Sequence, residues 1–197
     1  MLAQDKPGEW EPAMESRIKL NDEISRFPAE SAIGDASTPP ASWYTWPEFF
    51  ELEKQTVFRK HWLFVGRTDQ LREPGDYFSG MFLDWPYLVT KDEEGELRAY
   101  YNVCSHHGTC VASGEGKATQ FVCPYHGWTY GLSGDLKKAP RAGAMQSLKD
   151  RNLNLKPLAV DTFGPFVALH FGEPTVSLEE ELESLHQSFV SIQFLHR

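Results

Sequence analysis

The sequence predicts a mainly β fold, a small antiparallel β-domain with flanking helices. Short segments rich in β-branched and aromatic residues follow one another between residues 62 and 171. Turn sequences such as KDEEGEL and YGLSGDLKKA separate them, as in β-hairpins. Helical patterns occur only before and after this region, so helices are expected to flank the domain.

Composition limits the classes of protein that this chain can represent. It has 197 residues, of which 41% are hydrophobic and 13% aromatic, as expected for a folded globular protein. A formal net charge of −9 argues against a nucleic-acid-binding protein. No apolar run approaches the length of a membrane span, and the first residues resemble neither a secretory signal nor a transit peptide. We therefore expect a soluble intracellular protein.

The segment before the β-domain divides into two parts. Residues 1–42 are polar and rich in Pro, Glu and Ser, which predicts an extended or loosely ordered arm. Residues 43–60 form a lead-in segment, with a helix expected over roughly 46–60. Thr45 and Glu48 have the spacing of a capping box at its start.

The β-domain is expected over residues 61–172, and residues 173–197 follow it. Strands are expected at 62–67, 76–82, 85–91, 97–103 and 164–171. A second helix is expected to begin at a capping box formed by Ser177 and Glu180. Its apolar stripe consists of Leu178, Leu182, Leu185 and Phe189.

All three cysteines and three of the seven histidines lie between residues 104 and 128. Cys104 and His106 are followed, after sixteen residues, by Cys123 and His126, and each pair comes just after an expected strand. The odd, clustered cysteines indicate reduced metal-bound thiolates rather than a disulfide framework. Two loops that leave one β-scaffold side by side would bring these four side chains to one site.

Two kinds of metal site use two cysteines and two histidines. A Rieske [2Fe–2S] centre binds one iron through two Cys and the other through two His. A structural zinc site accepts the same ligands, but it usually separates a Cys pair from a His pair along the chain. Here each half is mixed, C-x-H and then C-x₂-H, which favours the iron–sulfur centre. Core cysteines and histidines without a metal would not explain this spacing.

The stretch CSHHG…CPYHGWTY resembles the Rieske signature. The resemblance implies a Rieske-type antiparallel β-domain whose [2Fe–2S] cluster is bound by Cys104, His106, Cys123 and His126. The lead-in PPASWYTWPEFFELEKQTVFRKHW and the motif DQLREPGDYFSG are similar to those of Rieske non-haem iron oxygenase large subunits, in particular plant-type choline monooxygenases. The similarity extends over roughly residues 38–171.

The resemblance also gives expectations for the remaining residues of the two loops. Respiratory Rieske proteins carry an extra cysteine in each loop, joined as a disulfide, whereas here Tyr125 occupies the second position. Cys110 therefore has no cysteine partner in the second loop, and it is expected to be a buried small apolar residue. His107 stands where many Rieske oxygenases have an arginine, and it is expected either to face solvent or to hydrogen-bond near the cluster. We do not count it as a ligand.

The resemblance implies ferredoxin-dependent oxidation of choline toward betaine aldehyde, in glycine betaine synthesis. That reaction also needs a mononuclear Fe(II) bound by two His and a carboxylate on a second domain. Because the chain ends at Arg197, we expect residues 173–197 to be the start of a truncated catalytic domain or a C-terminal helix. We assign no catalytic residue and expect the chain alone not to oxygenate choline. A stand-alone electron carrier and a zinc-stapled interaction module are the alternatives.

Partners and location also follow from the resemblance. The electron donor is expected to be a reduced ferredoxin or a similar protein, and members of the family form homo-oligomers. His126 or His106 is expected at the exposed edge of the cluster, and the resemblance implies that one of them, expected to be His126, faces the mononuclear iron of a neighbouring subunit. Four basic residues flank the loops and either steer an acidic donor or simply maintain solubility: Lys117, Lys137, Lys138 and Arg141. The chloroplast stroma is expected from the resemblance, and the cytoplasm otherwise.

Overall fold

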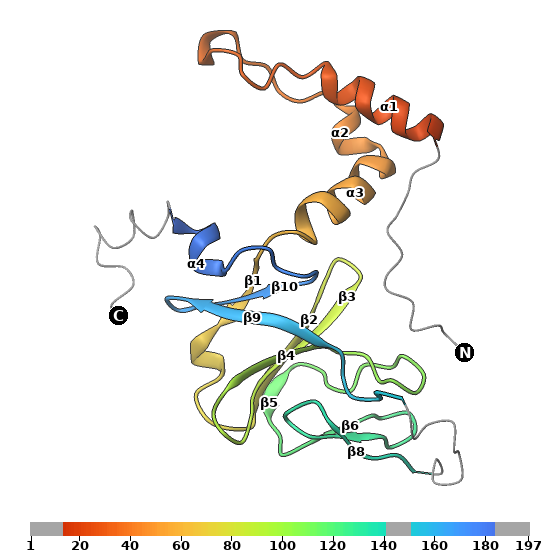
Figure 1. Cartoon of the computed structure of the whole chain (residues 1–197), viewed down its shortest axis with the longest axis vertical. Helices are drawn as coiled ribbons and strands as arrows, with labels where there is room; N and C mark the ends of the chain where they lie inside the picture. Colours follow the sequence, from red (N-terminus) through yellow and green to blue (C-terminus); the bar gives the residue numbers. More distant parts are fainter. Residues whose placement is uncertain (1–13, 141–150, 184–197) are drawn as a thin grey trace. The chain divides into compact units, whose positions relative to one another are not determined.

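The computed structural model describes residues 14–140 and 151–183 (Figure 1). The chain divides into two compact units, Ala3–His61 and Trp62–Arg197. The first is helical and the second is built from β-strands. Each unit is described by itself below.

The helical unit is held together by aromatic packing. Its elements are α1 (Met14–Ser25), the 3₁₀ helix η1 (Ile33–Asp35), α2 (Ser42–Thr45), α3 (Pro47–Glu53) and the π-helix η2 (Lys54–Phe58). The Trp43 ring lies 5.3 Å from that of Phe27 and 5.5 Å from that of Phe49, between ring centroids. The Ser42 hydroxyl donates a hydrogen bond to the Glu23 carboxylate, 2.9 Å away, and so links α2 to α1.

Two expectations for this unit were wrong. Residues 14–25 form a helix rather than an extended arm, because the segment consists largely of good helix formers and Leu20 is buried at 3% exposure. The lead-in helix has no capping box, because the Thr45 hydroxyl donates to the Ala41 carbonyl inside α2. α3 begins instead at Pro47, which suits the first turn of a helix since it needs no N–H partner there.

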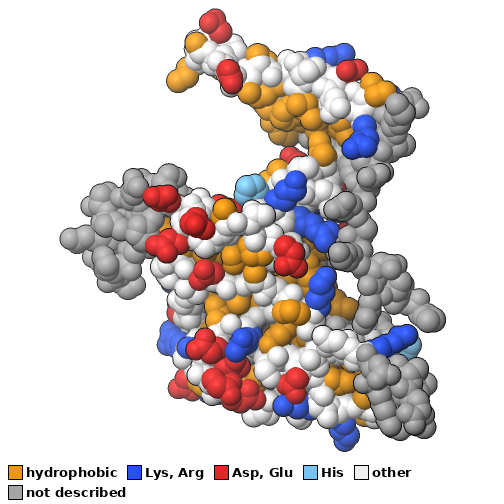
Figure 2. Space-filling model, viewed as in Figure 1, with side chains coloured by type: hydrophobic (Ala, Val, Ile, Leu, Met, Phe, Trp, Pro, Cys, Tyr) orange, Lys and Arg blue, Asp and Glu red, His pale blue; other side chains and the backbone are white. Residues whose placement is uncertain are grey.

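Figure 2 shows hydrophobic side chains gathered over the helical unit. Among its described residues, the large hydrophobic side chains classed as exposed are those of Ile18, Ile24, Ile33, Tyr44, Trp46, Phe50 and Val57. The largest exposed fraction is that of Ile33, at 97%. Taken alone, this unit therefore buries only part of its apolar surface.

The second unit is an antiparallel β-structure, which confirms the mainly β fold class. A seven-stranded sheet has the order β1-β10-β9-β4-β3-β2-β5, and a three-stranded sheet has the order β6-β7-β8. The strands are β1 (Leu63–Arg67), β2 (Asp76–Phe82), β3 (Trp85–Lys91), β4 (Leu97–Tyr101), β5 (Glu115–Lys117), β6 (Phe121–Val122), β7 (Thr129–Tyr130), β8 (Leu136–Lys138), β9 (Pro157–Phe163) and β10 (Phe166–His170). The 3₁₀ helix η3 (Thr68–Gln70) follows β1.

The five strands with expected ranges occur close to their expected positions. The short strands β6, β7 and β8 lie around the second loop and the expected hairpin turn that follows it, whereas β5 and β9 were missed. β2 and β3 have the expected ends, and β1, β4 and β10 differ by one or two residues at either end. β5 was missed because its sequence, EGK, has no apolar residue. β9 was missed because it starts at Pro157 and carries polar residues, yet it pairs with both β10 and β4. In both cases long-range pairing decides the strand.

The seven-stranded sheet is buried on both faces where it supports the metal-binding loops. Leu88 and Tyr100 face a core that includes Phe121 and Tyr130 of the small sheet. The neighbouring residues Val89 and Ala99 face a second core under β9 and β10. This alternation follows from the two-residue period of a β-strand. The small sheet is therefore fixed against one face of the large one.

The segment after β10 returns to the start of the β-unit. The backbone N–H of Trp62 donates to the Glu181 carboxylate (3.2 Å), and the indole N–H donates to the Val176 carbonyl (3.2 Å). The expected capping box of Ser177 and Glu180 is confirmed at the start of α4 (Leu178–Glu181). Leu178 is buried, whereas Leu185 and Phe189 lie outside the described residues. Among the described residues, none of the helices has the length and hydropathy needed to span a bilayer.

Candidate metal centre

Two loops with the same backbone hydrogen-bonding pattern carry the expected ligands. In the first loop (104–110), Cys104 N–H donates to the Thr109 carbonyl (2.9 Å), and the Cys104 carbonyl accepts from Gly108 (2.9 Å). In the second loop (123–128), Cys123 N–H donates to the Trp128 carbonyl (2.7 Å), and its carbonyl accepts from the glycine four residues later (3.0 Å). Each loop is thus closed on its own cysteine.

Glycine makes this closed loop possible. Gly108 has φ +77° and Gly127 has φ +72°, in the left-handed region where a side chain is strained. Each supplies the N–H that bonds back to the cysteine carbonyl. The glycine that follows each cysteine–histidine pair in the sequence therefore has a defined geometric role.

The two thiols lie at the buried ends of the loops. Cys104 is 2% exposed and Cys123 is 3% exposed. Burial raises the pKa of the Cys104 thiol, and its contact with the Cys123 thiol acts in the same direction. The Tyr130 hydroxyl, 3.3 Å from the Cys104 sulfur, opposes this effect. Two mutually close thiols without a nearby cation suit a metal, because metal binding removes the cost of burying the thiolates.

The two imidazoles lie at the exposed side of the same site. His106 and His126 have ring centroids 4.7 Å apart, with an angle of 70° between the planes. The ring nitrogens of His106, His107 and His126 come within 4.8 Å of one another. Partial desolvation lowers the pKa of His106, and the neighbouring imidazoles of His107 and His126 add to the effect. A neutral imidazole is the form that binds a metal.

Each of the expected histidine ligands lies against an aromatic ring of the second loop. The His106 ring is stacked on Trp128, with centroids 4.7 Å apart and planes 4° from parallel. The His126 ring is stacked on Tyr125, with centroids 3.9 Å apart and planes at 29°. The resemblance to known motifs gave these two aromatic residues no such role.

Two further residues support the first loop and were not identified from the sequence. The buried Asn102 side chain accepts hydrogen bonds from the backbone of Val111 (2.9 Å) and Ala112 (3.2 Å) and donates to the Ala112 carbonyl (2.8 Å). Tyr130 accepts from the backbone N–H of Ser105 (3.0 Å). Asn102 lies two residues before Cys104, and its polarity at the end of an apolar strand was the available signal.

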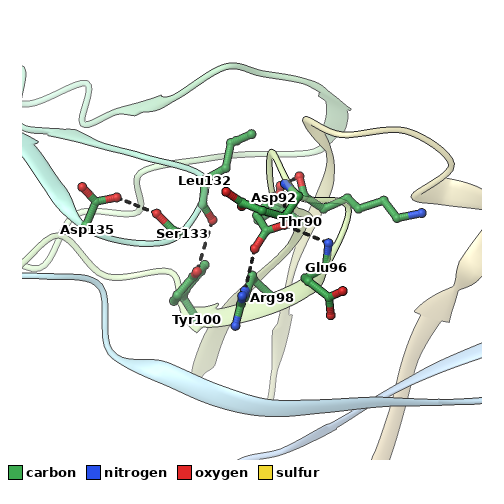
Figure 3. A network of polar contacts seen from close by, with 10 residues as sticks. Thr90, Asp92, Glu96, Arg98, Tyr100, Leu132, Ser133 and Asp135 are labelled. Atoms are coloured by element: carbon green, nitrogen blue, oxygen red, sulfur yellow. Dashed lines mark hydrogen bonds and ion pairs between the residues drawn. The ribbon is translucent and has the colours of Figure 1, made fainter.

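The large sheet also fixes the turn that follows the second loop. The Tyr100 hydroxyl on β4 donates to the Leu132 carbonyl, 3.1 Å away, between β7 and β8 (Figure 3). Burial raises the pKa of Tyr100 to about 12, so the hydroxyl stays a donor at neutral pH. Leu155 N–H donates to the Gly134 carbonyl of the same turn (2.8 Å). The scaffold under both loops is therefore cross-linked by hydrogen bonds.

Cys110 is exposed, which corrects the expectation of a buried apolar role. It is the last residue of the first loop, directly before the buried Val111. His107 is exposed as well, with its ring centroid 3.9 Å from that of His106. His170 is buried in β10, and its Nδ1 accepts from the Gly172 N–H (3.1 Å).

The expected basic rim is partly neutralised by neighbouring carboxylates. Lys117 on β5 pairs with Glu73, and Lys137 on β8 pairs with Asp135 (2.8 Å). Lys138 is exposed. The loops 104–110 and 123–128 contain no charged residue.

Arg141 of the expected basic rim and the histidines His186 and His196 lie outside the described residues. Among residues 14–140 and 151–183, the group of three or more potential ligands found close together is that of His106, His107 and His126. No second cluster of the kind that binds a mononuclear iron is found within these ranges.

The donor set fits an iron–sulfur centre bound between the two loops. It offers two sulfur ligands on the buried side and two nitrogen ligands on the exposed side, as a Rieske centre requires. Such a centre supplies one-electron transfer when it is bound.

Comparison with known proteins agrees with this geometry. Residues 61–150 match the model of the Rieske [2Fe-2S] domain. The chain is 42% identical over 184 residues to the chloroplastic choline monooxygenase of Spinacia oleracea, covering 88% of this chain and 42% of that protein. The Arabidopsis thaliana choline monooxygenase is 46% identical over 146 residues, covering 74% of this chain and 35% of that protein.

Solved structures give the same result. The apo form of the quaternary ammonium Rieske monooxygenase CntA matches with a TM-score of 0.75 and 32% identity, over 79% of this chain and 46% of that one. The chain thus spans less than half the length of the relatives that it matches. Together the domain match, the sequence identity and the shared fold establish that this chain carries a Rieske [2Fe–2S] domain and belongs to the Rieske oxygenase family.

Proposed function

We propose that the β-unit is the electron-transfer portion of a choline monooxygenase-like oxygenase. Its [2Fe–2S] cluster is bound by Cys104, His106, Cys123 and His126. The observation that carries the proposal is the placement of two buried thiols and two exposed imidazoles on two matching loops. The cluster would accept one electron and pass it on.

The surrounding residues define what the protein contributes. Buried side chains of the core exclude water from the two thiolates. The Tyr130 hydroxyl oxygen accepts a hydrogen bond from the Ser105 N–H. A metal-bound thiolate can only accept, so the Tyr130 hydroxyl would donate its own proton to the Cys104 sulfur. This hydrogen bond would stabilise the more negative, reduced form. The exposed His106 and His126 leave one side open to a partner.

Choline as the substrate is supported by the identity to the plant enzymes. In this proposal a mononuclear Fe(II) of the oxygenase would receive the electrons and would supply the O₂ chemistry that takes choline toward betaine aldehyde. Homo-oligomers are supported by a solved relative, a quaternary ammonium Rieske monooxygenase with inter-subunit electron transfer. The chloroplast is supported by the location of the plant relatives.

The cluster and its ligands are tested on the purified chain. An absorption spectrum and an EPR spectrum after reduction should show the features of a Rieske centre. Chemical analysis should find two iron atoms and two labile sulfides per chain. Cys104→Ser and Cys123→Ser should abolish the signal, whereas Cys110→Ser and His107→Ala should retain it. A zinc-containing, colourless and EPR-silent protein would reject the proposal in favour of a zinc-stapled module.

The electron donor is proposed to be a reduced ferredoxin or a similar acidic protein. Lys137 and Lys138 lie on β8, which pairs with β7 directly after the uncharged second loop. Lys137 is paired with Asp135, and Lys138 is exposed. Reversing both to Glu should slow cluster reduction at low salt, and added salt should reduce the difference. Equal reduction rates for the variant and the wild type at low salt would show that these lysines serve solubility alone.

The alternative function is a stand-alone Rieske electron carrier that serves another oxidase. It shares the proposed cluster and the exposed imidazoles of His106 and His126, so it differs from the oxygenase in where the electrons go. Sequencing the transcript beyond Arg197 separates the two functions. A reading frame that continues into a domain with two histidines and a carboxylate set to bind a mononuclear iron supports the oxygenase, and a stop codon directly after Arg197 supports the carrier.

A further inference from the structure

The two expected histidine ligands are each stacked on one aromatic ring, and both rings come from the second loop. Trp128 lies 4° from parallel with His106, although His106 belongs to the first loop. Tyr125 lies at 29° to its sequence neighbour His126. The second loop therefore contacts both imidazole rings, one in each loop.

Hydrogen bonds do not account for the orientation of these imidazoles. Among the bonds between described residues, none involves a ring nitrogen of His106 or His126. A histidine ligand can rotate about its bond to a metal unless another contact fixes the ring plane, and such contacts commonly come from neighbouring side chains. Here the stacked contacts that can fix the planes are those with Trp128 and Tyr125. The ring of His107 also lies 3.9 Å from His106 and 5.2 Å from His126, but it is tilted by 48° and 53° and so is not stacked on either ring.

The two stacks differ in how firmly they are held. Trp128 is 3% exposed and belongs to the core cluster that contains both thiols. It therefore presents a fixed face to His106. Tyr125 is 64% exposed and has ring contacts with His126 and His107. The plane of His126 is thus held by a ring that is itself open to solvent.

We propose that Trp128 and Tyr125 are positioning residues, Trp128 for the imidazole of His106 and Tyr125 for that of His126. The inference rests on the ligand set in the proposed function. Each stack restricts one histidine to a single ring orientation and so fixes the overlap of its nitrogen with the iron. Loss of one stack widens the orientations of one histidine and leaves the other unchanged.

Pulsed EPR of the reduced holoprotein tests this assignment, because it resolves the couplings of the two coordinating nitrogens separately. Tyr125→Ala should broaden or shift one nitrogen coupling, and Trp128→Leu should affect the other. Iron release to a chelator should be about tenfold faster in both variants, the size of effect typical for outer contacts of metal ligands. Tyr125→Phe and Trp128→Phe keep a ring and should restore most of the wild-type behaviour.

Matched controls separate positioning from general stability. Val122 is 48% exposed on β6, close in sequence to the second loop, so Val122→Ala should leave both nitrogen couplings and the iron-release rate unchanged. Phe121 is 3% exposed in the same core as Trp128, so Phe121→Leu should lower the melting temperature without changing the couplings. If Trp128→Leu does not fold, the Tyr125 variants decide the proposal.

The outcomes for the two proposals are distinct. Wild-type couplings and iron release in Tyr125→Ala would overturn the positioning role while leaving the ligand set intact. An equal change at both nitrogens in every variant would also overturn it, since the stacks would then not act on separate histidines. A wild-type protein without a Rieske EPR signal would instead contradict the proposed function.

Discussion

A single hydroxyl on the small sheet reaches the first loop of the metal centre. Tyr130 Oη lies 3.3 Å from the Cys104 sulfur and accepts from the Ser105 N–H at 3.0 Å. Tyr130 is completely buried, and burial raises the pKa of its hydroxyl. The group therefore remains a hydrogen-bond donor at neutral pH.

Tyr130→Phe should lower the midpoint potential of the cluster by about 20–60 mV, because one hydrogen bond to a sulfur ligand contributes about 0.5–1.5 kcal/mol to the reduced form. A redox titration followed by EPR measures the shift. Tyr77→Phe is the control, since that hydroxyl faces the Ser113 carbonyl. Equal potentials in wild type and Tyr130→Phe would contradict the role of this bond.

The Asn102 side chain makes hydrogen bonds with backbone groups of Val111 and Ala112, just after the first loop. Asn102→Ala should lower the free energy of unfolding by about 2–4 kcal/mol, because the buried N–H of Val111 and the partly buried N–H and carbonyl of Ala112 lose their partners. Urea unfolding measures the change. The exposed Ser113 next in the chain offers a control, as Ser113→Ala should stay within about 0.5 kcal/mol of wild type. Similar free energies of unfolding for Asn102→Ala and Ser113→Ala would show that the Asn102 hydrogen bonds do not stabilise the fold.

At the scale of elements, local sequence and long-range pairing contribute differently. The strands β2 and β3 were predicted with their ends, because both are rich in aromatic and β-branched residues. β9 carries weaker signals, but it connects β10 to β4 and so joins the two halves of the large sheet. α1 was missed because few apolar residues suggested a core, whereas helix propensity and the single buried Leu20 were sufficient.

The start of α4 gives a prediction at this scale. Ser177 Oγ accepts from the Glu180 N–H (3.2 Å), and the Glu180 carboxylate accepts from the Ser177 N–H (2.8 Å). Ser177→Ala should therefore destabilise the protein by about 1 kcal/mol. Thermal unfolding compared with Thr175→Ala, an exposed neighbour, measures the difference. A melting temperature equal to that of the control would show that the cap does not stabilise the folded chain.

At the scale of the whole molecule, one buried carboxylate links stability to pH. Burial alone would raise the pKa of Asp92, but the Arg98 guanidinium (2.7 Å) and the N–H groups of Glu96 and Glu94 outweigh it. The pKa therefore lies below its ordinary value of 3.8. Figure 3 shows this network at the turn between β3 and β4.

A lowered pKa in the folded state means that the ionised carboxylate stabilises the protein above about pH 4, and that this contribution disappears as the pH falls through the folded-state pKa. Asp92→Asn should therefore cost about 2 kcal/mol at pH 7 and progressively less below pH 4. Unfolding curves between pH 3 and 7 measure the difference, with the exposed Glu93→Gln as control. A constant difference across this range would exclude the ion pair as its cause.

The sequence by itself determined the fold class, the family and the set of residues to test as iron ligands. These depend on local patterns: strand-forming segments, turn residues and the spacing of two cysteine–histidine pairs. The tertiary structure alone decided that Cys110 is exposed, that Asn102 and Tyr130 support the first loop, and that Trp128 stacks on His106. These contacts join residues from separate loops and strands, so they exist only after the two sheets have packed and brought distant segments together.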